Sequence, residues 1–435
     1  MFNQLLNEAL KNCDQAEIFW VANEETPVSF EANRLKSVDT RQSSGAGMRI
    51  IKQGKIGASS TTNRSNLDEL VSRALEIVPY GPDSPILLPG PRDYLDTKIH
   101  DVGTVRLTTE EIIHVGSSLI AELKDLWPDV QWDARLSRSV SEVKLTNSQG
   151  FQGEYQKTVF GLGIEGTLVR DTDMLFVWES QTGCGPRIDT DEIRDNLNNR
   201  IRWADRVASP PKGDVPVIFT PKGVAGLLIG PLLSGFNGRN IAQGSSPLIG
   251  QIHSKLFDHR LTITDDPTCA FIPGSRPFDD EGVLARPTLL IDRGTVGNFL
   301  FDLQTALQAG CDSTGSAHRS ISGSPGPGTS VVIIDPGDSS FEEIVSKQEN
   351  ALIVESFLGA GQGNILAGDF SANVLLGYRV ANGEIVGRVK NTMISGNVYR
   401  ILADLVSLGS DSRWVGGGLR TPSIVVSGVS IASNG

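Results

Sequence analysis

The chain has 435 residues, enough for two or three domains that each bury a core of their own. Its 51 acidic residues outnumber its 39 basic residues, so the net charge is −12, and neither end carries a basic run. This charge argues against nonspecific binding to nucleic acid or an anionic membrane, and we expect neither as a partner. No apolar run approaches the ~18 residues of a membrane span, and the N-terminal segment lacks the pattern of an export signal. With four scattered cysteines and no CxxC pair, we expect a cytoplasmic protein with free thiols.

The first half of the sequence alternates between helical and strand-like segments. Residues 3–13 have a helical pattern, whereas residues 17–21, 29–38 and 45–59 are predicted to be strands. Gln53-Gly54 divides the last of these segments into a hairpin, because both residue types tolerate a tight turn.

Three further helices are predicted from their N-terminal caps. Ser65 can cap a helix with one apolar face. Thr108–Glu111 forms a capping box for a long helix, and Asp189–Glu192 begins another. Four strand candidates lie between Trp132 and Trp178. Together these elements predict an N-terminal α/β domain over residues 1–207, with helices packed on a mainly antiparallel sheet.

Residues 208–216 are the best domain boundary in the chain. Three prolines and one glycine in nine residues do not form a helix or a central strand, so we expect a linker. A glycine-rich apolar helix is predicted over residues 221–236. Short strands follow, with a hairpin at Asn382-Gly383. We therefore expect residues 217–435 to form a β-rich, barrel-like domain, and the whole chain to be of the α+β class.

The five histidines do not form a recognisable zinc motif. His253 and His259 are six residues apart, which places them on different faces of a helix, and no HExxH sequence occurs. Ser313, Ser316 and His318 do not define a serine nucleophile, and a hydrogen-bonded turn is the favoured interpretation.

Two loops nevertheless carry residues that could bind a ligand. Asp279, Asp280 and Glu281 are adjacent acids in a loop closed by Gly282, where carboxylates could hold a cation, a peptide amine or nothing at all. The segment Gly359–Gly363 is rich in glycine but lacks the spacing and the lysine of a phosphate loop. It predicts a turn or a close backbone contact.

Seven short motifs occur in the order found in one protein family. They are Asp265–Thr268, Pro277–Gly282, Ser313–Ser316, Gly359–Gly363, Gly368–Ser371, Val380–Ile385 and Ile394–Asn397. In this order they resemble the TldD/PmbA family, once described as modulators of DNA gyrase and now regarded as metallopeptidase components. The resemblance covers most of the chain from Val217 onward. It implies a cytoplasmic two-domain protein that works in a TldD–PmbA pair, cleaving unfolded peptides.

The resemblance also implies where zinc would bind. The catalytic chain of the family carries His-Glu-x-x-x-His on a helix, giving two zinc ligands and a base, and a late cysteine gives the third ligand. Here Ile229, Gly230 and Ser234 stand at those helix positions, and residues 411–420 contain no cysteine. This chain therefore resembles the metal-free PmbA (TldE) subunit, with no cofactor of its own and zinc expected only in a TldD-like partner. Pro231 should in addition bend the helix, since it cannot donate a hydrogen bond.

From this resemblance we expect a non-catalytic subunit that helps to form a peptide chamber, where a β-lined cleft holds an extended substrate. The candidate positions for binding substrate or partner are Asp279, Asp280, Glu281, Gly282, Gly361 and Gly363. The alternative is a stand-alone homodimer that binds peptides or assembles complexes without cleaving anything. An independent hydrolase with an unrecognised site is a third hypothesis.

Overall fold

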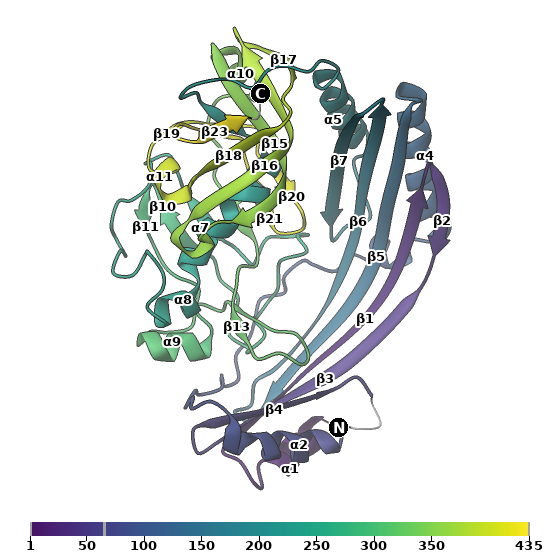
Figure 1. Cartoon of the computed structure of the whole chain (residues 1–435). Coiled ribbons are helices and arrows are strands. Elements are labelled where there is room, and N and C mark those ends of the chain that lie inside the picture. The colour runs from purple at the N-terminus through teal and green to yellow at the C-terminus, as the bar shows by residue number, and fades with distance from the viewer. Residues whose placement is uncertain (1, 64–66, 434–435) are drawn as a thin grey trace.

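In the computed structural model, which describes residues 2–63 and 67–433 except for the side chains of residues 360–362, a long curved sheet forms the N-terminal half (Figure 1). Its seven strands are antiparallel and have the order β4-β3-β1-β5-β6-β7, with β2 paired to β1. The strands are β1 (Gln15–Glu31), β2 (Arg34–Val38), β3 (Arg41–Lys52), β4 (Lys55–Thr61), β5 (Val130–Asn147), β6 (Gln152–Arg170) and β7 (Asp173–Gly183).

The strands are longer than the sequence pattern predicts. β1 continues ten residues beyond the predicted segment 17–21 and ends at Glu31. Residues 132–178 hold three strands rather than the predicted four, because polar positions that we took for turns lie within continuous strands. The hairpin at Gln53-Gly54 is confirmed, with φ angles of 51° and 75°.

Helices cover the outer face of this sheet at its two ends. They are α1 (Phe2–Ala9), α2 (Glu69–Ile77), α3 (Val102–Arg106), α4 (Thr109–Leu126) and α5 (Thr190–Trp203). The predicted capping box of α4 is confirmed, since Thr108 and Glu111 bond to each other's backbone amides. Asp189 likewise caps α5. Ser65 lies outside the described residues, and α2 begins at Glu69 instead.

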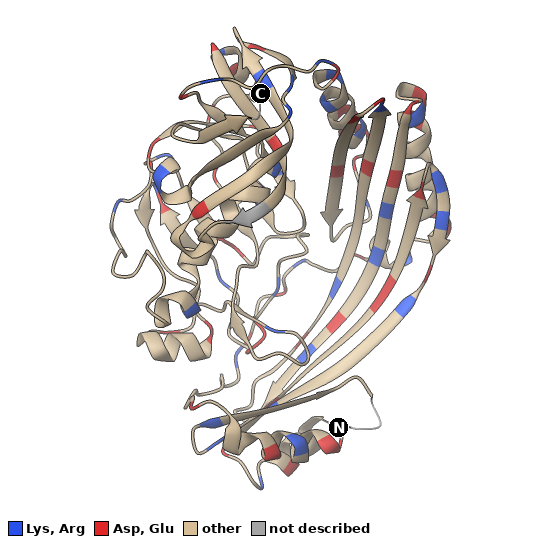
Figure 2. Ribbon diagram, in the orientation of Figure 1, with Lys and Arg blue, Asp and Glu red and all other residues tan. Residues whose placement is uncertain are grey.

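Alternate side chains of β1 separate the two faces of the sheet. Ile18 packs with α1 and α2, and Phe30 packs with α4, so even-numbered positions face outward toward the helices. Odd-numbered positions such as Glu17 and Phe19 face the C-terminal half of the chain, which we call the inner face. Figure 2 shows charged residues spaced along these long strands.

The C-terminal half is rich in strands, as expected. One sheet has the order β19-β22-β8-β15-β16-β18-β23, with β17 paired to β16, and a second has the order β11-β10-β9-β14-β21-β20. Its strands are β8 (Val217–Phe219), β9 (Ile263–Asp265), β10 (Thr288–Asp292), β11 (Thr295–Val296), β12 (Ala317–His318), β13 (Gly326–Pro327), β14 (Val332–Ile334), β15 (Asn350–Gln362), β16 (Asp369–Ala381), β17 (Glu384–Arg388), β18 (Thr392–Asn397), β19 (Leu405–Leu408), β20 (Arg413–Val415), β21 (Leu419–Thr421), β22 (Ile424–Val426) and β23 (Ser430–Ser433).

The chain is of the α+β class, and the β-rich half has open sheets. Over the described residues neither large sheet closes on itself, so the expected barrel-like shape is not a closed barrel. The hairpin at Asn382-Gly383 is confirmed by φ angles of 51° and 79°. The helices of this half are α6 (Pro221–Gly223), α7 (Ile229–Phe236), α8 (Gly238–Ala242), α9 (Leu303–Ala309), α10 (Phe341–Ser346) and α11 (Val398–Ile401).

The two halves share one hydrophobic core. Ile193 and Leu197 of α5 pack in the same cluster as Ile353 of β15 and Tyr378 of β16. Residues 208–216 contain no helix or strand, and the segment joins α5 to β8. The shared core means that the curved sheet and the β-rich half are packed against each other, not merely tethered.

Candidate functional site

The helix after β8 is irregular at the positions where zinc ligands were considered. A π-helical segment, Val224–Leu228, separates α6 from α7. A π turn holds more residues than an α turn and commonly marks a functional or formerly functional position in a helix. The disruption predicted from Pro231 therefore takes the form of a wide turn just ahead of it.

The side chains of α7 do not offer a zinc site. Ile229 is partly buried against the C-terminal core, and Gly230 is exposed, with nothing within 4 Å of an added Cβ. The Ser234 hydroxyl and carbonyl both accept from the Asn240 amide, at 3.3 and 2.8 Å. No group of three His, Cys, Asp or Glu residues elsewhere in the described residues is arranged to hold a metal ion.

The acidic loop is buried instead of solvated. Asp279 accepts backbone hydrogen bonds from Glu281, Val283 and Ala317, each at 2.9 Å, and its side chain is fully buried. Burial raises the pKa of Asp279, although Arg276 opposes this shift. Gly282 has a φ of 83°, as a tight turn requires. Asp279 and Glu281, two of the candidates for binding substrate or partner, are therefore buried inside the chain, while Asp280 keeps partial exposure.

Glu281 belongs to a buried charge cluster between the two halves. Its carboxylate accepts from Arg49 of β3 at 2.6 Å and from the Leu303 amide at 2.7 Å. Arg49 also pairs with Glu17 of β1 at 2.8 Å, and Arg319 pairs with the same Glu17 oxygen at 2.6 Å. We call Glu17, Arg49, Glu281 and Arg319 the lower cluster.

A second buried cluster lies at the edge strand β7. Arg200 of α5 bonds to Glu179 of β7 at 2.5 Å and to Glu355 of β15 at 2.6 Å. Lys222 of α6 lies 3.1 Å from Glu179, and Arg413 of β20 lies 3.3 Å from it. We call these five residues the edge cluster.

Burial and neighbouring charges strongly shift the pKa values of two residues in the edge cluster. Burial, reinforced by Arg200, lowers the pKa of Lys222 to about 7. Burial acts to raise the pKa of Glu179, but Arg200, Lys222 and Arg413 together lower it to about 2. Lys222 also lies 3.8 Å from the ring centre of Trp178 and donates to the Trp178 carbonyl. The cluster thus holds three basic side chains against two carboxylates away from water.

The inner face of the curved sheet is hollowed into a cavity of about 1220 Å³, which we call the sheet groove. All of its lining residues belong to the N-terminal half. Its floor is made of small side chains, namely Ser137, Ser139, Gly161, Gly163 and Ser180. Such a floor leaves room for the backbone of another chain.

One end of the sheet groove is acidic. Asp133 of β5 and Glu165 of β6 are directly paired in register, and Glu165 is paired in turn with Trp178 of β7. Their side chains share the inner face, and like charges directly opposite each other are unfavourable across a sheet. Arg135, two residues from Asp133 on the same face of β5, also lines the groove, so this end carries two carboxylates beside one guanidinium.

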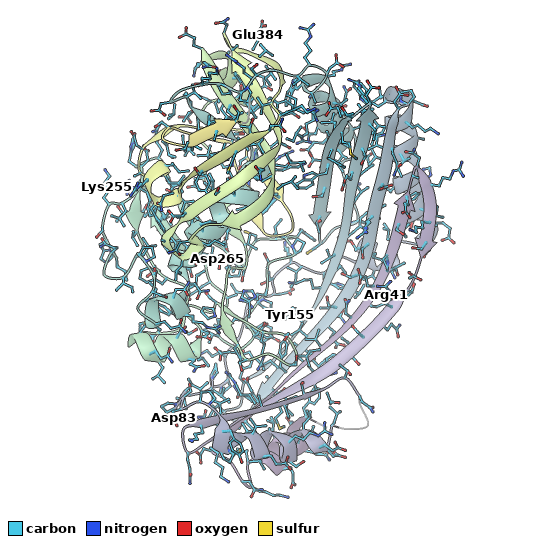
Figure 3. The ribbon with its side chains drawn as sticks, viewed as in Figure 1. Arg41, Asp83, Tyr155, Lys255, Asp265 and Glu384 are labelled. Carbon is cyan, nitrogen blue, oxygen red and sulfur yellow. The ribbon has the colours of Figure 1, made fainter. Side chains whose placement is uncertain are left out.

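Beyond the opposite end of the groove lies Lys157, two residues past Val159 on the same face of β6. It is half-buried and donates to the Pro273 carbonyl at 2.6 Å. Tyr155, two residues further, contacts Phe278 and lies where the C-terminal half meets the sheet (Figure 3). Sequence reasoning missed Lys157, because one lysine in a strand of mixed polarity carries no local signal.

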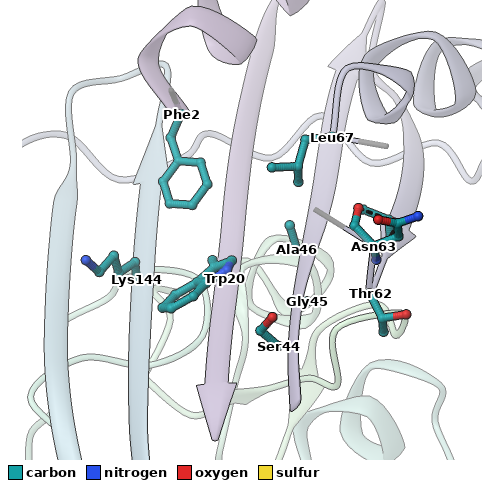
Figure 4. A pocket seen from close by; sticks show the side chains of 10 residues that line it. Phe2, Trp20, Ser44, Gly45, Ala46, Thr62, Asn63, Leu67 and Lys144 are labelled. Carbon is teal, nitrogen blue, oxygen red and sulfur yellow. Dashed lines mark hydrogen bonds between the residues drawn. The ribbon is translucent and has the colours of Figure 1, made fainter. Parts of the chain in front are cut away.

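A smaller cavity of about 190 Å³ lies on the outer face, beside α1 (Figure 4). Phe2, Trp20 and Leu67 line it, with Lys144 at its margin. Its volume admits a single side chain.

The remaining candidates do not converge on these cavities. Gly363 has a φ of 129° in the turn that ends β15, as the turn prediction requires, and Gly361 lies in the last residues of β15, whose side chains are not described. Ser313 bonds to the Phe301 carbonyl, and Ser316 bonds to Thr314, so neither lies against His318 as a nucleophile would.

Comparison with known proteins identifies the chain's relatives. Residues 212–433 match the family described as PmbA/TldA metallopeptidase C-terminal domain, and residues 16–78 match PmbA/TldA metallopeptidase domain 1. The chain belongs to the PmbA/TldD family. A metalloprotease of Methanothermobacter thermautotrophicus is 26% identical over 409 residues, covering 89% of this chain and 86% of the relative.

Solved structures share the PmbA/TldD fold across the whole chain. TldE from Thermococcus kodakarensis has a TM-score of 0.92 at 23% identity, covering 99% of each chain. A Thermotoga maritima protein described as a putative modulator of a DNA gyrase has a TM-score of 0.87 at 22% identity, covering 99% of each chain. The resemblance inferred from seven short motifs is thus confirmed. No helix within the described residues is long and apolar enough to cross a membrane.

Proposed function

We propose that this chain is the metal-free, PmbA/TldE-type subunit of a cytoplasmic metallopeptidase that degrades or processes unfolded peptides. One observation carries the proposal: Ile229, Gly230 and Ser234 occupy the motif positions of the family's zinc helix without offering a strong metal ligand or a base. In this proposal zinc belongs to a TldD-like partner chain.

In the proposed pair with a TldD-like partner, the sheet groove of this chain would bind the peptide. Its volume of about 1220 Å³, its floor of serine and glycine and its inner position suit an extended peptide. The partner's zinc would cut the peptide, and this chain would hold the part that is not being cut. The uncharged serines and glycines of the floor favour the binding of many peptide sequences over one.

Proteolysis of an unstructured peptide tests this proposal, using this chain alone, a TldD-like partner alone and their mixture, with zinc counted in each. We expect zinc and cleavage only where the partner is present, and faster cleavage in the mixture. One zinc per chain and cleavage by this chain alone would overturn the proposal. The alternative, a homodimer that binds peptides without cleaving them, gains support if the partner's rate is unchanged and this chain still binds peptide.

A further inference from the structure

Lys157 differs from the buried basic residues around it. Arg49, Arg200, Lys222, Arg276 and Arg388 each form an ion pair with a carboxylate. Within the described part of the chain, the Lys157 ammonium has no carboxylate within 4 Å, and its one hydrogen bond goes to the Pro273 carbonyl. A half-buried cation without a counterion is costly, because burial removes water without supplying an opposite charge.

The surroundings of Lys157 favour an anion. Burial lowers its pKa to about 8, with Arg276 adding to the shift, and Asp280 and Cys184 act in the opposite direction. His318 accepts a hydrogen bond from Arg276 and has a pKa lowered to about 3, so it stays neutral. Asp280 is turned toward the Arg319 amide at 2.8 Å. At neutral pH the ammonium is therefore charged and free to bind an additional acceptor.

Position connects this cation to the groove. Val159 lines the groove, and Lys157 lies two residues before it on the same face of β6, so Lys157 lies just beyond this end of the groove. The acidic end at Glu165 lies eight residues away along β6, or ~26 Å in an extended strand. An extended peptide of about eight residues has the same length. Lys157 and the carboxylates of Asp133 and Glu165 are therefore separated by about one peptide length.

We propose that Lys157 binds a carboxylate of the peptide held in the sheet groove, namely the free carboxylate at the peptide's C-terminus. This inference rests on the proposed function, because it assumes that the groove holds peptide. It also sets the direction of the bound chain: the C-terminus lies at Lys157, and the N-terminal amine lies toward Asp133 and Glu165.

Peptide binding to the full-length chain tests the inference through fluorescence anisotropy. The probes are a labelled eight-residue Gly/Ser/Ala peptide with a free C-terminus, the same peptide with an amidated C-terminus, and an amidated version ending in glutamate. We expect the free acid to bind about fivefold to tenfold more tightly than the amide, the effect of one charge-assisted contact at a half-buried site. Lys157→Gln should abolish this preference and Lys157→Arg should retain it, whereas Lys124→Gln, on the exposed side of α4 and away from the groove, should leave it unchanged.

The possible outcomes distinguish a failure of this inference from a failure of the proposed function. If both peptides bind equally to the unaltered chain, the groove holds peptide and the carboxylate site is refuted. If neither peptide binds, the proposed function fails together with the inference. If the amidated glutamate peptide matches the free acid and responds to Lys157→Gln, a carboxylate site is supported but the C-terminal source is refuted. The comparison of acid with amide requires no mutation, so it stands even if a variant fails to fold.

Discussion

Replacing Lys222 with methionine should cost more stability at high pH than at neutral pH. Removal of an ordinary lysine salt bridge has the opposite pH dependence. Burial lowers the Lys222 pKa from 10.5 to about 7, even though Glu179 and Glu355 are close by. Below about pH 7 both the folded and the unfolded chain carry the proton, so the cost of burying the charge is fully present. Between about pH 7 and pH 10.5 only the unfolded chain keeps the proton, and stability rises with pH.

The size of the effect follows from that shift in pKa. A pKa that falls from 10.5 to about 7 corresponds, at about 1.36 kcal/mol per pH unit, to about 5 kcal/mol as an upper bound. Methionine keeps the apolar stem beside Trp178 but does not titrate. The edge cluster of the variant then holds two arginines against two carboxylates. At pH 7 we expect Lys222→Met to lie within about 1 kcal/mol of the unaltered chain, or above it, since the lost contacts to Trp178 offset part of the gain.

Urea unfolding of both chains from pH 6 to pH 10 measures this effect, and the difference between them isolates Lys222. The difference should grow in favour of the unaltered chain by several kcal/mol as the pH rises from 7 to 10. Lys124→Met, on the exposed side of α4, provides the matched control and should give a constant difference. A Lys222→Met difference that is constant, or that shrinks with rising pH, would refute the reasoning, because Lys222 would then be a stably charged member of the cluster.

Four further substitutions test buried and exposed contacts of the fold. Arg49→Met leaves Glu17 and Glu281 buried without their shared partner, so urea unfolding should show a loss of about 3–5 kcal/mol. Arg73→Ala, which breaks an exposed pair on α2, should cost under about 1 kcal/mol, and equal losses would contradict the distinction. Gly230→Ala should raise stability by about 0.5–1 kcal/mol, because an added Cβ meets nothing within 4 Å and alanine favours a helix. Gly223→Ala should lower the melting temperature, since its Cβ would lie 2.4 Å from the Val354 carbonyl oxygen; a rise there would show that the backbone adjusts.

Local signals in the sequence predicted local structure well. The capping box at Thr108–Glu111 and the turns at Gln53-Gly54 and Asn382-Gly383 depend only on residues a few positions apart, and all are found. Strand lengths were harder to predict, because long antiparallel strands tolerate polar residues in their interior where one face is open. For this reason we predicted four strands between Trp132 and Trp178, where the structure has three.

Long-range contacts explain what the sequence could not reveal. Glu281 meets Arg49 across 232 positions, and Arg319 meets Glu17 across 302, so no local pattern distinguishes a buried acid from a solvated one. The same holds for Lys157, whose missing counterion is visible only once the fold places every carboxylate. The interpretation of Ile229, Gly230 and Ser234 as positions of a lost zinc motif depends on the family resemblance alone, since an absent ligand leaves no trace in composition.

The two buried charge clusters hold the curved sheet against the C-terminal half. The lower cluster holds the bottom of the curved sheet to the C-terminal half, and the edge cluster holds its edge strand, so widening the space between the halves would separate buried charges. A folded domain of 100 residues has a radius of gyration of ~13 Å and does not enter a space of about 1220 Å³. In the proposed function, this limit on size would admit chains that have lost their tertiary structure and would exclude intact proteins without any sequence being read.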